Sequence, residues 1–154
     1  MRRYWNVEFV VTYDSDWQHN LLDLKNFEQS IKSNPEAKIF LGSRFKWDDK
    51  NITLSKKIIL KLWILFTFFI SNIKLSDAHN WYRVIKKEAL NDIKITLDWM
   101  WHASEIVDII AEKKIPFVEV PVVIKYDEYS MAKWQKSSNA INIALKMIWS
   151  KFFR

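Results

Sequence analysis

The chain has 154 residues, which is enough for one globular domain with a substantial core. Hydrophobic residues make up 49% and charged residues 27%, a composition that excludes an intrinsically disordered protein. Cysteine is absent, which excludes disulfides and thiolate metal sites. The net charge of +6 suits a partner rich in phosphate, such as a nucleotide, a nucleic acid or an anionic lipid surface, although a solvated basic surface is the commoner explanation.

The first half of the chain alternates predicted strands and helices, as an α/β fold does. Residues 7–13 and 37–44 are predicted strands, and an amphipathic helix is predicted over 20–35. A polar loop over 46–51 leads into an apolar segment, 52–75. Lysines interrupt this segment, and its unbroken apolar part is shorter than the roughly 20 residues of a bilayer span. We therefore expect a helix that is buried or faces a membrane.

The second half continues the same pattern. A short strand is predicted at 82–85 within the polar stretch 76–90, and an amphipathic helix over 102–114. Residues 115–126 form a predicted strand whose prolines favour a sheet edge. A basic amphipathic helix is predicted over 130–154. No repeat or linker divides the sequence, so we expect residues 1–154 to form a single domain.

Two aspartates follow the first predicted strand. Asp14 and Asp16 stand at its carboxyl end, where open α/β sheets place their ligands. Two carboxylates can hold Mg²⁺ or Mn²⁺ while water and phosphate oxygens fill the remaining positions. The D-x-D pattern also occurs by chance in many loops. The position of the pair, with Gln18 and His19 following, is what favours a metal site.

Other polar residues are weaker candidates for a functional site. Arg44 and Arg83 have the planar fork that pairs with phosphate oxygens, although a lone arginine more often forms a surface salt bridge. His79 and His102 are candidate ligands or catalytic groups, with a structural role as the commoner alternative. Glu105 has apolar neighbours, so it is either a base with a shifted pKa or an ordinary helix surface charge.

Six segments of the chain resemble motifs of one enzyme family in the same order. The segments read "DSDWQH", "LGSRF", "SDAHNWYR", "HASEI", "VEVPVVIKY" and "SMAKWQKSSNAINI". Together they resemble the family-2 glycosyltransferases, especially the dolichyl-phosphate-mannose-synthase-like and bacterial polysaccharide branches. The resemblance covers almost the entire chain and implies a GT-A fold, the Rossmann-like α/β fold of nucleotide-diphospho-sugar transferases.

The family's first βα units, of roughly 30 residues each, have no counterpart in this sequence. We therefore expect a partial GT-A fold, the C-terminal portion of a catalytic domain. The missing N-terminal half is then an expected partner. Without that half a sheet edge and apolar helix faces would stay uncovered, so we expect poor solubility of the chain alone.

The resemblance also implies an activity. It implies transfer of a sugar, generally with inversion, from a nucleotide-diphosphate donor to a polyprenyl-phosphate or saccharide acceptor, for cell-surface polysaccharide or glycolipid synthesis. Asp14, Asp16 and Gln18 would hold Mg²⁺ or Mn²⁺ against the diphosphate. A hydroxyl acceptor would require a base, for which Asp77 is the first choice and Glu105 the second, whereas an anionic lipid phosphate would require none. The expected substrate-binding residues are Arg44, Arg83, His19, Lys133 and Gln135.

Such an enzyme is expected in the cytoplasm, peripheral to the inner face of the membrane, with segment 58–73 and the closing helix against the lipid. Core packing and solvation explain these two segments equally well. No nucleic-acid partner is expected of a transferase. Two other functions stay open: a basic nucleic-acid-binding module, which the charge and the aromatic residues favour, and an inactive truncated fragment.

The composition is abnormal in two residue types. There are nine tryptophans and one glycine, where an average content of about 7% predicts roughly eleven glycines. The turns and helix ends that need a positive φ therefore lack glycine, the residue usually found there. At Trp17, Trp81 and Trp134 the resembled family has glycine, and the other six are expected in loops or at small-residue positions. These six are Trp5, Trp47, Trp63, Trp99, Trp101 and Trp149.

We hypothesise that the nine tryptophans are glycines written with the wrong genetic code. Some bacteria translate the codon UGA as glycine and others as tryptophan, and the abundance of Lys, Ile, Asn and Phe fits an AT-rich genome. A genuine tryptophan-rich protein is the alternative. The gene decides between the two, because UGG codons at these positions would exclude the misreading.

Overall fold

The computed structural model describes residues 7–14, 19–46, 54–78, 80–96 and 102–125 of the chain. Within them lie the strands β1 (Phe9–Thr12), β2 (Ile39–Ser43), β3 (Arg83–Lys86) and β4 (Phe117–Pro121). The helices are α1 (Leu24–Ser33), α2 (Leu54–Ser71) and α3 (His102–Glu112). Short 3₁₀ turns cover Leu21–Asp23, Arg44–Lys46 and Lys87–Asn91. The structure is therefore α/β, and each of these strands and helices overlaps a segment predicted from the sequence.

The strands form one mixed sheet in the order β1-β3-β2-β4. β3 is antiparallel to both of its neighbours, whereas β2 and β4 are parallel. As a result β1, β2 and β4 all end at the same edge of the sheet, and β3 begins there. The register places Arg83, the first residue of β3, opposite Thr12 on one side and Leu41 on the other. We call this edge the strand-end edge.

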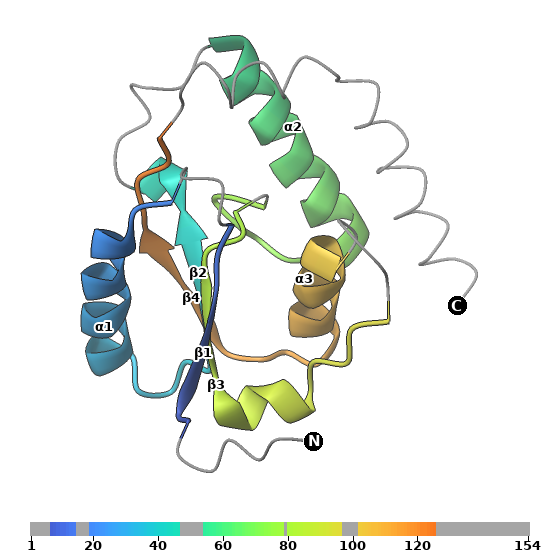
Figure 1. The fold of residues 1–154 in the computed structure, drawn as a ribbon. Helices are drawn as coiled ribbons and strands as arrows, with labels where there is room; N and C mark the ends of the chain where they lie inside the picture. Colours follow the sequence, from blue (N-terminus) through green and yellow to red (C-terminus); the bar gives the residue numbers. More distant parts are fainter. Residues whose placement is uncertain (1–6, 15–18, 47–53, 79, 97–101, 126–154) are drawn as a thin grey trace.

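Helices cover both faces of the sheet, with α1 on one side and α2 and α3 on the other (Figure 1). Side chains alternate along β2 and β3 to serve the two layers. Phe40 and Val84 belong to the buried cluster that includes Phe27 of α1. Ile39 and Ile85 belong to the second cluster, which includes four isoleucine and valine residues of α3. Two apolar cores on opposite faces thus fix the sheet.

The single glycine lies where β2 approaches β3 closely. The Gly42 amide donates a hydrogen bond to the Tyr82 carbonyl over 2.8 Å. A Cβ at position 42 would lie 2.9 Å from that carbonyl oxygen and 3.2 Å from Asn80 Oδ1. Any side chain would therefore force the two segments apart, and only glycine fits without adjustment.

The two edges of the described sheet are β1 and β4. β4 ends at Pro121, which confirms that the prolines mark an edge strand. On the other side, the only described strand that pairs with β1 is β3, and Val11 is 42% exposed. Whether a further part of a larger domain pairs with β1 stays a prediction.

Within the apolar segment 52–75, Leu54–Ser71 form α2, and residues 72–75 follow the helix without regular secondary structure. The Ser71 hydroxyl donates a hydrogen bond to the Asp108 carboxylate, which joins the end of α2 to α3. Ile73 and Leu75 then enter the same core as α3. Among the described residues, no helix is both long enough and apolar enough to cross a bilayer.

Two expectations about tryptophan and glycine are wrong for the described residues. Trp63 lies in the middle of α2 and packs on Phe66, so it is neither in a loop nor at a small-residue position. Two residues other than glycine adopt a positive φ: Asn72, which follows α2, and Lys114, which follows α3. Neither Trp63 nor Trp81 has a positive φ. Their backbone therefore does not require glycine.

Several predicted features lie outside the described residues: the loop over 47–51, the closing segment 130–154 and the remaining tryptophans. These tryptophans are Trp5, Trp17, Trp47, Trp99, Trp101, Trp134 and Trp149.

Candidate functional site

Four of the predicted site residues lie around the strand-end edge. Asp14 follows β1 and is exposed, and Arg83 opens β3. Arg44 follows β2 directly, in the 3₁₀ turn Arg44–Lys46. Asp77 lies in the segment that leads back from α2 to β3 and is bonded to Arg44. Strand direction explains the assembly, because β1 and β2 end where β3 begins.

Arg83 is a buried cation that interacts electrostatically with two carboxylates. The residue is only 2% exposed, and burial lowers the pKa of its guanidinium to about 10. The negative charges of Asp14 and Asp77 act in the opposite direction and favour the charged form. The guanidinium carbon lies 6.0 Å from the centre of the Trp81 ring, a cation–π distance. Arg83 is therefore still protonated near neutral pH, and the fold holds its charge at the strand-end edge.

Arg44 and Asp77 form a buried ion pair. Arg44 Nε lies 2.6 Å from Asp77 Oδ2, and the two side chains are 10% and 1% exposed. The Arg44 backbone amide donates to the same oxygen over 3.1 Å. Asn80 supports this segment, because its Oδ1 accepts a hydrogen bond from the Tyr82 amide over 3.0 Å. The pair thus joins the end of β2 to the segment that precedes β3.

Glu119 is a member of this network that the sequence analysis missed. It lies on β4 opposite Leu41, and its Oε1 accepts hydrogen bonds from the amides of Ser76 and Asp77 over 2.7 and 3.2 Å. Its Oε2 is 3.9 Å from Lys46 Nζ. Glu119 therefore shapes the turn that presents Asp77. The available signal was a lone carboxylate inside the apolar run "FVEVPVVI".

His19 lies on a cluster of aromatic residues. It forms an isolated antiparallel bridge with Ile124, and its ring meets Tyr82 edge-on with 5.2 Å between ring centres. Phe27 and Tyr13 also lie against Tyr82. Tyr82 is fully buried, and this burial is the main reason why its pKa is raised to about 12. The aromatic cluster thus supports His19, which directly follows the stretch 15–18.

Glu105 has a different environment from Asp77. It is 2% exposed on the first turn of α3. Its carboxylate accepts three hydrogen bonds from Thr96: two from the backbone amide, over 3.0 and 3.1 Å, and one from the hydroxyl, over 2.6 Å. These bonds tie the segment before α3 to the helix. The contacts with Thr96 therefore indicate a structural role for Glu105.

Several predicted site residues lie outside the described residues. These are Asp16, Gln18, His79, Lys133 and Gln135, and the side chain of His102 is likewise not described. Among the described residues there is no group of three or more His, Cys, Asp or Glu side chains able to hold a metal ion. Asp14 is an exposed residue, and a carboxylate is the type of ligand that Mg²⁺ and Mn²⁺ prefer.

The sequence is similar to that of a glycosyltransferase. It is 31% identical over 131 residues to the UDP-N-acetylglucosamine–dolichyl-phosphate N-acetylglucosaminyltransferase of Methanococcus voltae, a match that covers 82% of this chain and 52% of the relative. It is 25% identical over 150 residues to the uncharacterized protein MJ1222 of Methanocaldococcus jannaschii, which covers 95% of this chain and 61% of that protein. The chain thus spans only 52% and 61% of the length of these curated relatives.

No family model matches the sequence. No solved structure matches it either. The similarity to the Methanococcus voltae protein therefore relates this chain to a glycosyltransferase. The described part of the chain has an α/β fold with a mixed four-stranded sheet.

Proposed function

We propose that this chain is the C-terminal part of a family-2 glycosyltransferase domain with a GT-A fold. It would act on a nucleotide-diphosphate sugar and a polyprenyl-phosphate acceptor. The Methanococcus voltae relative is named for a UDP-linked donor and a dolichyl-phosphate acceptor. The observation that carries the proposal is the strand-end edge, where the buried Arg44 and Arg83 stand at the ends of β2 and β3 and the exposed Asp14 follows β1.

The charges of this edge suit a diphosphate. Arginine remains protonated at neutral pH and pairs bidentately with phosphate oxygens. Arg83 would supply such a cation, in an orientation fixed by the sheet register. Asp14, together with Asp16 and Gln18, would hold Mg²⁺ or Mn²⁺. The metal, when bound, would offset the negative charge that develops on the nucleoside diphosphate as it leaves.

An acceptor phosphate changes what the carboxylates must do. In a single in-line displacement, a phosphate oxygen forms a bond to the anomeric carbon while the bond from that carbon to the donor diphosphate breaks, which inverts the configuration. The attacking oxygen is already anionic, so no strong base is needed. Asp77 is then a positioning residue for Arg44, as the 2.6 Å ion pair supports. Glu105 would act only through Thr96.

Ligand-induced stabilisation tests the proposal on the chain itself. UDP-N-acetylglucosamine and inorganic pyrophosphate would each be added with and without Mn²⁺. A ligand at about 100 times its Kd stabilises the fold by about 2.7 kcal/mol, or a rise in Tm of roughly 5–10 °C. We expect this rise only with Mn²⁺ present. We expect Asp14→Asn to remove the Mn²⁺ dependence and Arg83→Met to remove binding.

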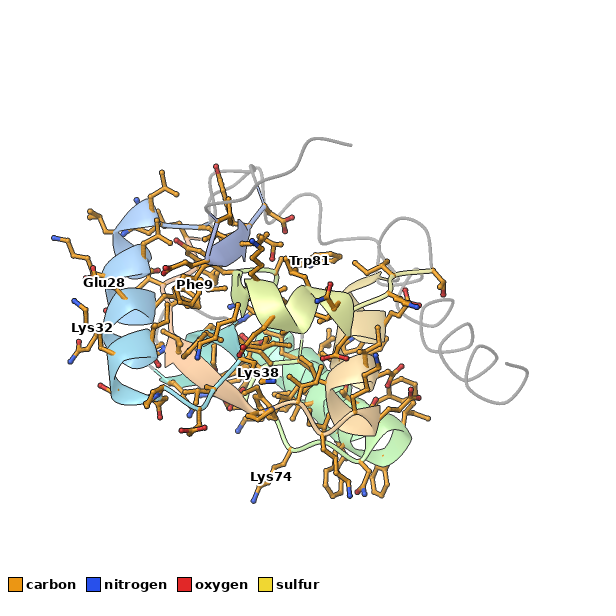
Figure 2. All side chains as sticks on the ribbon, turned by 90° about the horizontal axis from the view of Figure 1, so that it is seen from below. Phe9, Glu28, Lys32, Lys38, Lys74 and Trp81 are labelled. Carbon is orange, nitrogen blue, oxygen red and sulfur yellow. The ribbon has the colours of Figure 1, made fainter. Side chains whose placement is uncertain are left out.

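Glu28→Gln is a matched control, because Glu28 is an exposed carboxylate on the outer side of α1, beside Lys32 (Figure 2). This variant should bind like the unaltered chain. If neither ligand raises Tm with Mn²⁺, or if Asp14→Asn binds unchanged, the strand-end edge is not a donor site. Tight, salt-sensitive binding of single-stranded nucleic acid in place of the sugar nucleotide would support the nucleic-acid-binding alternative.

A further inference from the structure

Lys46 and Glu119 form a second ion pair next to that of Arg44 and Asp77. Lys46 ends the 3₁₀ turn that follows β2, and Glu119 lies on β4. The distance from Lys46 Nζ to Glu119 Oε2 is 3.9 Å, beyond the roughly 2.7–3.2 Å of an N–H···O hydrogen bond. The Lys46 side chain is 45% exposed, and the Glu119 side chain only 10%. The ammonium group is therefore held by charge alone, at the surface of the network.

Glu119 is the fixed member of this pair. Its Oε1 accepts hydrogen bonds from the amides of Ser76 and Asp77 over 2.7 and 3.2 Å. The Ser76 hydroxyl is also bonded to the hydroxyl of Ser43, the last residue of β2, over 2.7 Å. The carboxylate thus keeps its place, whereas the ammonium of a lysine stands at the end of a flexible four-carbon stem. Lys46 is therefore the member that can move.

Lys46 is also the most accessible of the three cations described at the strand-end edge. The Arg44 side chain is 10% exposed and its Nε is bonded to Asp77, and Arg83 is 2% exposed. An ion pair with an exposed lysine contributes little to stability, so its loss costs little. A phosphate oxygen would offer the ammonium a shorter, charge-assisted hydrogen bond. An incoming anion therefore meets the least competition at Lys46.

We propose that Lys46 binds a phosphate group of the substrate by exchanging its partner. Without substrate the ammonium pairs with Glu119. With substrate it turns to a phosphate oxygen, while Glu119 stays bonded to the two backbone amides. The inference deepens the proposed function, on which it rests, by adding a phosphate-binding residue to the strand-end edge. The diphosphate of the donor and the polyprenyl phosphate acceptor both present such a group.

Partner exchange gives the two members of the pair opposite effects on binding. Removing the charge of Lys46 removes a contact with the phosphate, which weakens binding. Removing the charge of Glu119 releases the lysine for the phosphate, which strengthens binding. A pair that only held the fold together would give the same direction of change in both cases, a loss of affinity.

Isothermal titration calorimetry of the full chain in about 20 mM NaCl, where charges are weakly screened, tests this difference. One arm uses UDP-N-acetylglucosamine with Mn²⁺, and the other uses geranyl phosphate, a soluble isoprenoid phosphate. We expect Lys46→Gln to weaken binding of at least one ligand by about fivefold. The ligand that loses affinity identifies the source of the phosphate. Lys46→Arg keeps the charge and should bind within about twofold of the unaltered chain.

Glu119→Gln keeps an oxygen for the two amides but removes the negative charge. It should strengthen binding of the same ligand by about threefold. The gain should be clearly smaller in a chain that also carries Lys46→Gln, because the two side chains act on each other. Should Glu119→Gln fail to fold, Lys46→Gln and Lys46→Arg still decide the outcome.

Lys32 and Glu28 provide a matched control pair. They form an exposed ion pair on the outer side of α1, with 2.6 Å between Nζ and Oε1 (Figure 2). Lys32→Gln and Glu28→Gln should therefore leave both affinities unchanged. The Tm of Lys46→Gln should stay within about 2 °C of the unaltered chain, because its side chain is partly in solvent.

The outcomes separate this inference from the proposed function. If the unaltered chain binds a ligand and Lys46→Gln binds both ligands equally well, partner exchange is wrong and the proposed function stands. The same holds if a folded Glu119→Gln chain binds more weakly, or gains equally with and without Lys46. If the unaltered chain binds neither ligand, the proposed function fails and this inference fails with it.

Discussion

Arg44 Nε and Asp77 Oδ2 lie 2.6 Å apart in a pair that is almost completely buried. The pair connects the end of β2 to the segment that returns from α2. Removing one partner of a buried pair leaves an uncompensated charge, which costs about 3–5 kcal/mol. We therefore expect Arg44→Met and Asp77→Leu each to lower the free energy of unfolding by about 3 kcal/mol or more, measured by denaturant titration.

The double variant Arg44→Met/Asp77→Leu should lose less than the sum of the two single variants, because it leaves no charge without its partner. Lys32→Ala provides the control. It breaks the exposed pair with Glu28 on α1, and we expect no measurable change in stability. Additive effects at Arg44 and Asp77 would show that the two side chains act independently.

Gly42 should tolerate no side chain. In Gly42→Ala the new Cβ would lie 2.9 Å from the Tyr82 carbonyl oxygen, so β2 and the start of β3 must separate. We expect a loss of about 1–3 kcal/mol in the free energy of unfolding. Ser33→Ala, at an exposed position that ends α1, should change stability by less than about 0.5 kcal/mol. A Gly42→Ala variant as stable as the unaltered chain would contradict the close contact.

Asp23 should make stability depend on pH. Burial raises the pKa of this carboxyl group, and the hydrogen bond from the Val123 amide only partly offsets the effect. A raised pKa means that the folded chain holds the proton more tightly than the unfolded chain. Stability is therefore lost as pH rises through the folded pKa.

Asp23→Asn removes this titration but keeps an oxygen for the Val123 amide. We expect the Tm of the variant to exceed that of the unaltered chain by about 1–3 °C at pH 7, and the difference to shrink towards pH 3. A thermal melt series over this range measures it. A difference that grew on acidification would mean that the charged carboxylate stabilises the fold.

Trp63 offers a test of the genetic-code hypothesis at the level of the protein. A glycine in the middle of α2 costs about 1 kcal/mol of helix stability, and it would also lose the edge-on contact with Phe66. If tryptophan is the native residue, Trp63→Gly should destabilise the fold by about 2 kcal/mol in denaturant titration. A glycine variant of equal or greater stability would favour the misreading, which the codons in the gene then decide.

Local patterns in the sequence predicted the elements of the fold but not their arrangement. The apolar runs at 7–13 and 37–44 contain β1 and β2, and the 3.6-residue periodicity of 102–114 contains α3. The reversed direction of β3 depends on pairing between distant residues, which leaves no local trace. The same holds for the contact of Asp77 with Arg44, because the two are far apart in the sequence.

The candidate site was predicted in part for the same reason. The end of a predicted strand identified Asp14, whereas residue type and the family resemblance identified Arg44 and Arg83. The role of Glu119 depends on the parallel pairing of β2 with β4, which brings its carboxylate to the amides of Ser76 and Asp77. The sequence showed that Glu119 is charged, but it could not show which backbone amides its carboxylate would contact.

The segment from Arg44 to Arg83 connects β2 to β3 and contains α2. Both of its ends are anchored independently of its middle: the first by the bond to Asp77, the second by the register of β3 with its two neighbours. Substitutions on the outer face of α2 would therefore leave both guanidinium groups in place. The outer face of α2 can therefore vary in sequence without moving the two arginines at the strand-end edge.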